Sequence, residues 1–179
     1  MRMKSIAILM AAAFVTTLFA IRNLHGEERT MSTLTIASPA FPHNGMIPSK
    51  HTCDGTDVNP PLSFDNIPEK SKSLALIVDD PDAPRGTWVH WVAWNIGPGT
   101  RKIAENSVPR GARQGTNDFR KQAYGGPCPP SGTHRYFFKL YALDTSLSLN
   151  AGATKAQLEE AMKGHVLGLS ELIGLYRRR

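Results

Sequence analysis

Cysteine is scarce in this sequence, and so are internal repeats and runs of one kind of charge. Two cysteines in 179 residues are too few for a small disulfide-rich protein or for a zinc module with four thiolate ligands. Hydrophobic residues make up 41% of the chain and charged residues 20%, which excludes a disordered polymer of low hydrophobicity and high net charge. The length fits one folded domain rather than two.

Helical periodicity is also rare, and most apolar segments have the composition of strands. Short apolar or aromatic runs between turns rich in Pro, Gly, Asn and Asp predict strands at 34–37, 74–78, 88–96, 136–143 and 166–176. Only 154–163 predicts a helix, with Thr154 as N-cap and Gly164 as its stop. Within it, Leu158, Ala161 and Met162 share one side. Many strands and one late helix predict a mainly β fold, an antiparallel sandwich.

The first 26 residues have the shape of a secretory signal. Arg2 and Lys4 form a basic head, an uncharged apolar run extends from Ile6 to Ile21, and a polar segment follows. The run is shorter than the roughly 20 apolar residues of a spanning helix. We therefore expect residues 1–26 to be a signal peptide, residues 27–179 to form one domain in the periplasm or outside the cell, and no membrane span to remain. An uncleaved anchor, or a buried helix of the domain, is the alternative.

The distribution of charge argues against a nucleic-acid partner. The formal net charge is +6, and removal of residues 1–26 takes away three basic residues and no acid, which leaves +3. Three of the remaining basic residues are the last three, Arg177 to Arg179. Because no Lys/Arg run is interleaved with aromatic residues, the sequence does not predict a nucleic-acid surface.

Polar side chains gather at the ends of the predicted strands. Asp80 follows one strand, His90 lies just inside the next, and His134 opens a third after a Gly/Pro-rich loop. Alternation places His134 and Tyr136 on one face, and it places His90 on the face of Val92 and Trp94. These groups predict one small pocket suited to an anion, because imidazole and backbone N–H groups donate to phosphate-like oxygens.

Each of these residues also has a purely structural interpretation. A histidine at the start of a strand is often held by a structural hydrogen bond, and the segment from Asp80 to Pro84 has the composition of a turn. The residues alone leave both interpretations open.

Several short motifs, taken in order, carry a family resemblance. They are Cys53-Asp54-Gly55 with Asn59-Pro60-Pro61, Asp80-Pro81-Asp82-Ala83-Pro84, His90-Trp91, the run from Gly126-Pro127-Cys128-Pro129-Pro130 to His134-Arg135-Tyr136, and the ending from Gly164 to Tyr176. Together they cover about residues 33–177. The chain resembles the phosphatidylethanolamine-binding protein (PEBP) family, and most of all its bacterial and archaeal Raf kinase inhibitor-like members.

The resemblance implies an antiparallel Greek-key β-sandwich with one or two short helices and an anion pocket at one end. Its ligand-binding residues would be Asp80, His90, Gly126, Pro129, His134 and Tyr136. Asp82 and Pro84 match motif positions with a structural role, in which Asp82 braces the loop. The resemblance implies no cofactor.

The two cysteines lie in loops that the resemblance places near the pocket. If the chain is exported, the compartment favours a disulfide between Cys53 and Cys128. The alternative is a pair of free thiols. A metal site from His51, Cys53 and His90 lacks the dense ligand spacing of metal motifs, and no metal is predicted.

We therefore expect a non-enzymatic protein that binds a small anion with a phosphoryl or carboxylate group and modulates a protein partner such as a kinase or protease. The alternative is a hydrolase of small esters or phosphoesters with Ser131 or Cys128 as nucleophile, although no Gly-x-Ser-x-Gly elbow occurs. The sequence leaves open whether the chain forms a homodimer.

Overall fold

The computed structural model describes residues 33–178, so the predicted signal peptide lies outside the described residues and stays a prediction. The elements are β1 (Thr35–Ala37), β2 (Gly45–Met46), a 3-10 turn η1 (Ser49–His51), β3 (Leu62–Asp65), β4 (Ser73–Asp80), β5 (Trp88–Ile96), β6 (Lys102–Ile103), β7 (Arg113–Gln114), β8 (His134–Leu143), α1 (Lys155–Met162) and β9 (Val166–Tyr176). Among these residues, no helix is long and apolar enough to cross a membrane.

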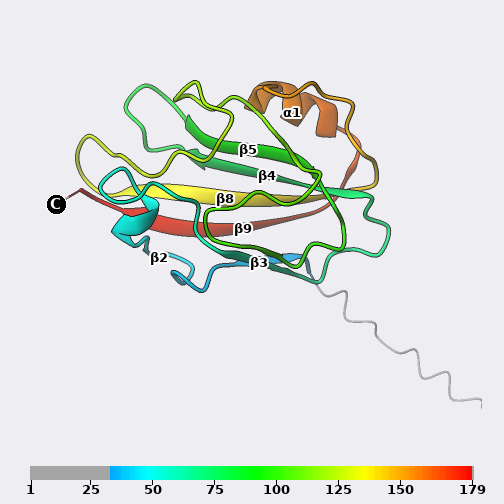
Figure 1. Cartoon of the computed structure of the whole chain (residues 1–179), viewed down its shortest axis with the longest axis horizontal. Coiled ribbons are helices and arrows are strands. Elements are labelled where there is room, and N and C mark those ends of the chain that lie inside the picture. The colour runs from blue at the N-terminus through cyan, green and yellow to red at the C-terminus, as the bar shows by residue number, and fades with distance from the viewer. Residues whose placement is uncertain (1–32, 179) are drawn as a thin grey trace, which may run out of the picture. The chain divides into compact units, whose positions relative to one another are not determined.

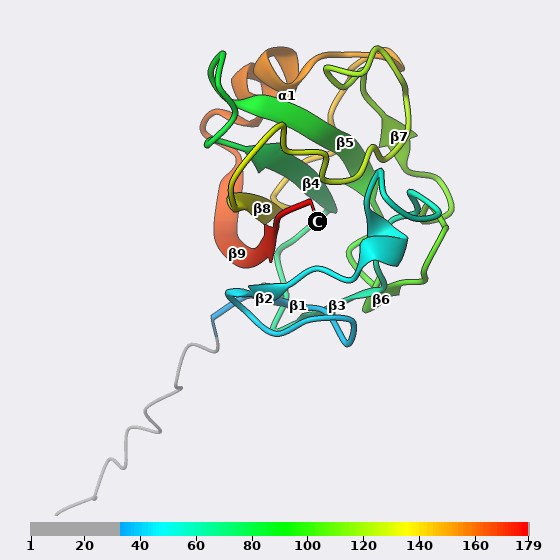
Figure 2. The same cartoon turned by 90° about the vertical axis from the view of Figure 1, so that its left-hand side faces the viewer.

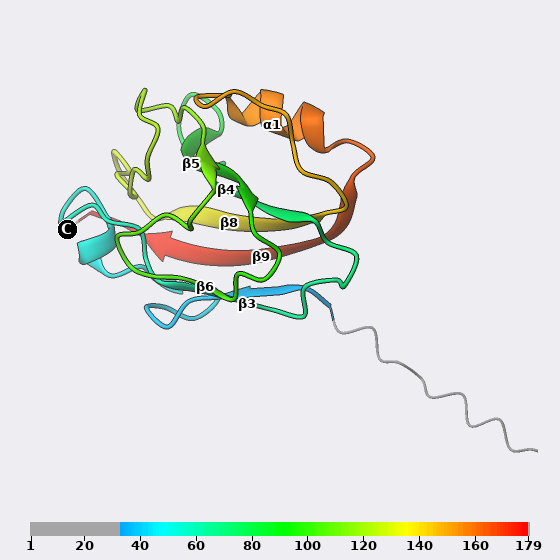
Figure 3. The ribbon, with the colours of Figure 1, turned by 45° about the vertical axis from the view of Figure 1, so that its right-hand side comes forward.

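Two sheets and one helix form three layers (Figures 1 and 3). The larger sheet has the order β2-β9-β8-β4-β5-β7, the smaller one has the order β1-β3-β6, and α1 covers the opposite face of the larger sheet. Strands β8-β4-β5-β7 follow the Greek-key order, because β8 returns to lie beside β4. The predicted sandwich is confirmed. One pair departs from the antiparallel pattern: β2 runs parallel to β9 over two residues.

The central strand β4 is buried along its whole length, which explains its continuous apolar sequence. Leu74, Leu76 and Val78 pack into the core between the two sheets. Ala75 and Ile77 pack into a second core beneath α1. The strand extends two residues beyond the predicted end at Val78, so that Asp79 and Asp80 continue the alternation and face opposite sides.

The predicted helix is confirmed as α1. Thr154 accepts a hydrogen bond from the backbone N–H of Gln157, whose side chain in turn accepts from the Thr154 backbone. This capping box satisfies two N–H groups that the first helical turn leaves free. Leu158 and Met162 are buried against the sheet, while Gly164 has a positive φ of 78° just beyond the helix.

A β-bulge in β5 overturns the predicted orientation of His90. Val78 pairs with Trp91, but the next residue, Asp79, pairs with Val89, so that His90 is an extra residue in β5. Val92 and Trp94 face α1, whereas the His90 ring packs against Tyr136, which lies in the core between the sheets. The assignment of His90 to the face of Val92 was therefore wrong, because a bulge re-aims the side chain that it displaces.

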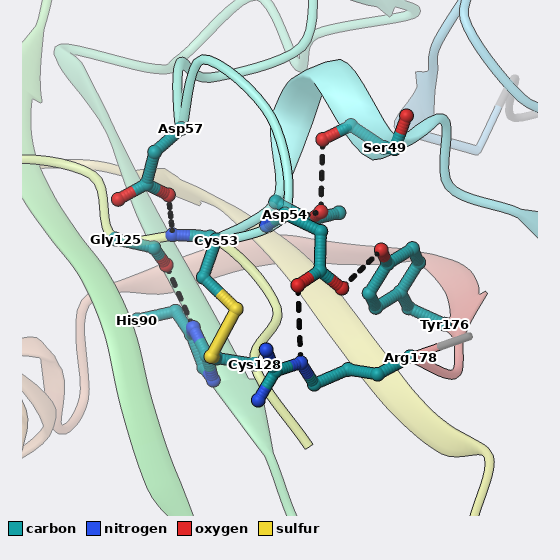
Figure 4. Close-up of a disulfide and its surroundings, with 11 residues drawn as sticks. Ser49, Cys53, Asp54, Asp57, His90, Gly125, Cys128, Tyr176 and Arg178 are labelled. Carbon is teal, nitrogen blue, oxygen red and sulfur yellow. Dashed lines mark hydrogen bonds and ion pairs between the residues drawn. A yellow bond between two sulfur atoms is a disulfide. The ribbon is translucent and has the colours of Figure 1, made fainter. Parts of the chain in front are cut away.

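Cys53 and Cys128 form a disulfide, as predicted (Figure 4). Their Cα atoms are 5.4 Å apart and their positions are separated by 75 in the sequence. The bridge joins the loop after η1 to the loop before β8. It is reinforced by a backbone hydrogen bond in which Cys53 N–H donates to the Pro127 carbonyl.

Candidate functional site

The predicted pocket residues meet at one end of the larger sheet, where β4 ends and β5 and β8 begin. Figure 2 looks onto this end, which also carries the C-terminus. A cavity of about 270 Å³ opens there. Its lining residues are Asp80, Ala83, Pro84, Trp88, His90, Phe119, Cys128, Pro129, Pro130 and His134. The sequence thus identified most of the charged and polar groups of this cavity.

His134 is held by a buried carboxylate. Its Nδ1 lies 2.7 Å from Asp80 Oδ2, and both side chains are at least nine-tenths buried. A carboxylate only accepts hydrogen bonds, so Nδ1 carries the hydrogen and the second ring nitrogen, Nε2, is left for a ligand. Asp80 also accepts from the backbone N–H of Asp82 at 2.8 Å, which fixes the carboxylate in place.

His90 is held by a neutral group instead. Its Nδ1 lies 2.7 Å from the carbonyl oxygen of Gly125, to which it donates (Figure 4). Burial lowers the pKa of His90 below its usual value of 6.5, and this effect outweighs the Gly125 carbonyl and the Asp80 charge, which both raise it. The ring is therefore neutral at neutral pH. It packs edge-on against Tyr136 and Phe119, with ring centroids 5.2 and 5.4 Å away.

The loop before β8 forms the rim of the cavity and is anchored from two sides. The Gly125 N–H donates to the His90 carbonyl at 3.0 Å, and the Gly126 N–H donates to Asp57 Oδ1 at 2.6 Å. A Cβ on Gly126 would lie 2.5 Å from the Asp57 carboxylate and from the His51 carbonyl. Position 126 therefore requires glycine, because any side chain would clash with these two groups. Gly126 does not line the cavity itself; it positions the rim.

Tyr136 lies behind the cavity and is fully buried. Its hydroxyl has no hydrogen-bond partner within residues 33–178. Burial raises the pKa of Tyr136 above its usual value, and the negative charges of Asp80 and Asp82 raise it further. A neutral hydroxyl without a partner is a costly group to bury unless something else accepts its hydrogen bond.

Asp82 has a bracing contact and does not line the cavity. Its carboxylate accepts from the Arg135 guanidinium at 2.7 and 2.9 Å and from the Arg135 backbone N–H at 3.0 Å. These bonds lower the pKa of Asp82 to about 2. They tie the loop after β4 to the start of β8. Pro84, the second residue expected to be structural, forms part of the cavity wall.

Three lining residues were missed by sequence reasoning: Ala83, Trp88 and Phe119. Trp88 immediately precedes the bulged segment of β5, and its position two residues before His90 was an available signal. Phe119 lies in a loop without periodicity, and it reaches the site because the Asn117 side chain donates to the His90 carbonyl. No pattern in the sequence indicates that contact.

His51, Cys53 and His90 do not come together as a group of metal ligands in the described part of the chain. Within it, no group of three His, Cys, Asp or Glu side chains could hold a metal ion. Cys53 is bridged to Cys128, and His51 Nδ1 donates to the Val58 carbonyl.

The fold and the site define a class of protein: a two-sheet β protein with a small, histidine-lined cavity where the strands end. Residues 37–177 match the family model described as phosphatidylethanolamine-binding protein, and the chain belongs to this family.

Relatives and solved structures agree with this assignment. The chain is 55% identical over 150 residues to a UPF0098 protein of Methanothermobacter thermautotrophicus, covering 81% of this chain and 99% of the relative. It is 46% identical to a UPF0098 protein of Pyrococcus horikoshii, covering 99% and 91%.

Two solved structures are similar in fold and sequence. A PEBP homologue of Chlamydia trachomatis has a TM-score of 0.80 and 43% identity, covering 82% of this chain and 99% of the homologue. YbcL of Escherichia coli, described as a new member of the mammalian PEBP family, has a TM-score of 0.78 and 28% identity, covering 83% and 100%. The bacterial and archaeal branch fits these relatives.

Proposed function

We propose that this protein binds a small oxyanion, a phosphoryl or carboxylate group, in the cavity between His90 and His134, and that it does so without chemical turnover. One observation carries the proposal. The buried Asp80–His134 pair fixes an imidazole at the wall of a cavity, with Nδ1 on the carboxylate and without a second protein hydrogen bond on Nε2 within residues 33–178. An imidazolium with a carboxylate on Nδ1 presents Nε2–H as a charge-assisted donor to an anion. Tyr136 does not line the cavity, but its ring centroid lies 5.2 Å from that of His90 and 6.5 Å from that of His134.

Two features favour binding over the hydrolase alternative. Cys128 is bridged to Cys53, so its sulfur is not a thiolate nucleophile. The hydroxyl of Ser131 belongs to an exposed residue that does not line the cavity. A general base without a nucleophile within reach supports ligand positioning rather than covalent catalysis.

The disulfide also supports the proposal that the protein works in the periplasm or outside the cell. Structural disulfides persist in oxidising compartments and are rare in the cytosol. Fractionation of cells that express the full chain, beside a chain lacking residues 1–26, tests this. The proposal requires that only the full chain reaches the exported fraction.

Calorimetry with inorganic phosphate tests the binding function. His134→Gln removes the imidazole donor and should weaken phosphate binding roughly 10- to 150-fold, the range expected for one hydrogen bond to a charged group. His165→Gln is the matched control, because His165 is exposed and lies next to the opposite end of β9. Equal affinity in His134→Gln and the wild-type protein, or no binding by the wild-type protein, contradicts the proposal.

A further inference from the structure

A second cavity, here called the side cavity, is lined by residues of β5 and β7 and of the loops that precede β3, follow β6 and precede β8. Figure 2 shows β6 and β7 on its right-hand side. The volume of the side cavity is about 270 Å³. It has no lining residue in common with the cavity at the end of β4, so the two are separate candidate sites.

Asp57 supplies the only carboxylate among the residues that line the side cavity, and no lysine, arginine or histidine lines it. Asp57 Oδ1 accepts a hydrogen bond from the Gly126 N–H at 2.6 Å, and the other oxygen, Oδ2, is turned away from this bond (Figure 4). Within residues 33–178, Oδ2 accepts no hydrogen bond, and it does not belong to the buried polar atoms without a partner. This oxygen is therefore accessible to a ligand.

Two aromatic side chains of the side cavity are fixed by hydrogen bonds at their polar ends. Trp91 Nε1–H donates to Gln114 Oε1 at 2.8 Å, and the Tyr124 hydroxyl donates to the His51 carbonyl at 2.8 Å. The two rings pack edge to face, with centroids 5.8 Å apart. Two valines continue this wall. The wall thus offers an apolar and aromatic surface beside a single negative charge.

The charge and the surface of the side cavity match an organic cation. An ammonium group donates a charge-assisted hydrogen bond to a carboxylate oxygen, aromatic rings attract cations, and an alkyl chain packs on apolar side chains while its charged end stays polar. The Tyr124 hydroxyl adds no charge, because burial raises its pKa well above the usual value and the charge of Asp57 raises it further. An anion would meet only the negative charge of Asp57.

We propose that the side cavity binds a small alkylammonium ion, with the ammonium group on Asp57 Oδ2 and the alkyl chain against Trp91, Tyr124 and the valines. This site does not depend on the anion-binding function proposed above, and either proposal stands if the other fails. The single free carboxylate oxygen favours an ammonium group over a guanidinium, which needs two oxygens for a bidentate pair.

Butylamine and 1-butanol are the probes, because they share an alkyl chain and differ in charge. At pH 7 butylamine is protonated, as the amine of a lysine side chain is. Titration followed by the NMR signal of the Trp91 indole N–H, assigned with Trp91→Phe, reports on this cavity. Butylammonium should bind roughly 10-fold or more tightly than 1-butanol. Equal binding, or no shift of this signal with either compound, overturns the proposal.

Asp57→Asn assigns the preference to a residue. The amide oxygen can still accept from the Gly126 N–H, while the negative charge is lost, so the preference for butylammonium should disappear. Asp118→Asn is the matched control and should keep the preference, because Asp118 also accepts a backbone N–H, from Val89 at 2.7 Å, but does not line the side cavity. Persistent preference in a folded Asp57→Asn protein overturns the assignment. If that variant does not fold, the ratio in the wild-type protein decides.

A third ligand distinguishes a free amine from the lysine side chain of a partner protein. Nα-acetyl-lysine-N-methylamide carries the same ammonium group on a blocked backbone, which lies outside a cavity of about 270 Å³. Butylammonium should bind at least as tightly as this blocked lysine. Tighter binding of the blocked lysine overturns the assignment to a small amine, because contacts outside the cavity would then contribute to recognition.

Discussion

The two buried carboxylates at the end of β4, Asp79 and Asp80, occupy neighbouring positions and face opposite sides of the larger sheet. Asp79 is fully buried on the α1 side, where Lys139 of β8 and Lys155 of α1 both pair with it. Asp80 is equally deep, but it pairs with His134 at the wall of a cavity. Two neighbouring aspartates of similar burial thus have different partners and different surroundings.

The two aspartates differ in the number of their charged partners and in the space beside them. At Asp79 two lysines, Lys139 from β8 and Lys155 from the helix, more than balance one carboxylate. At Asp80 the only side-chain partner within residues 33–178 is His134, and a cavity lies beside this pair. The two carboxylates are buried to nearly the same extent, whereas their partners and the space beside them differ. Four changes test this comparison.

The largest change in stability is expected from substitutions on the α1 side of the larger sheet. Lys139→Met with Lys155→Met leaves Asp79 buried without a counter-charge, which should lower the free energy of unfolding by about 3–5 kcal/mol. Urea denaturation measures it. Adding Asp79→Leu should restore most of the loss, because an apolar replacement of the whole group is tolerated. Lys163→Met, in an exposed pair with Glu160, is the control and should change little. A double variant as stable as the wild-type protein contradicts the structural role.

The second largest effect is expected from removal of the disulfide, which lies on the cavity side of the comparison. Cys53→Ser with Cys128→Ser should lower the free energy of unfolding by about 2–4 kcal/mol. It should also weaken phosphate binding, since the rim loop loses its covalent tie to the loop after η1. The lysine double variant, measured at a temperature where it is folded, should bind phosphate normally. If the serine variant kept full affinity, the bridge would be irrelevant to the pocket.

Asp80→Asn is expected to affect binding more than stability. The amide oxygen can still accept from His134 Nδ1, but the charge-assisted hydrogen bond to the carboxylate becomes a weaker neutral one. Phosphate affinity should therefore fall roughly 10-fold, or about 1.4 kcal/mol, as measured by calorimetry. Asp65→Asn, on an exposed residue of β3, serves as the control. A normal affinity in Asp80→Asn would make the two carboxylates of β4 equivalent and remove the contrast between them.

The smallest effect concerns Asp82 and its pH dependence. Its pKa of about 2 in the folded protein, against 3.8 as its ordinary value, stabilises the fold above about pH 4, and this contribution is lost as the pH falls from 4 to 2. Because Arg135 is half-exposed, the contribution is at most about 1 kcal/mol. Urea denaturation of the wild-type protein and Asp82→Asn should show a difference at pH 7 that shrinks at about pH 2.5. A constant difference contradicts the assignment to this ion pair.

Much of the fold was predictable because alternation and capping are local signals. The segments 88–96 and 166–176 are strands with the predicted bounds, and the Thr154 cap is formed as expected. The disulfide followed from the family resemblance and the expected compartment. The short strand β3 and the two-residue strands β2, β6 and β7 were missed, because they are defined by partners elsewhere in the sequence.

The pocket was predictable in its members but not in its geometry. His134 and Tyr136 follow simple alternation. The bulge at His90 is invisible in the sequence, because its neighbours Val89 and Trp91 are both apolar and β5 is buried on both faces. The role of Asp79 was hidden for a different reason. Its parity with Ala75 and Ile77 places it beneath α1, but its lysines lie 60 and 76 positions away.

The disulfide also divides the pocket residues into two groups according to their position in the sequence. Asp80 and His90 lie inside the bridged segment between Cys53 and Cys128, while His134 and Tyr136 lie outside it. A pulling force on the two chain ends cannot extend that segment of 75 positions, which withholds roughly 250 Å of contour length at about 3.3–3.6 Å per residue. The chain beyond Cys128, which contains β8 and β9, can still be pulled away from β4, and that step separates His134 from His90. A ligand bound between the two histidines would resist this separation, so the unfolding force would depend on whether the cavity is occupied.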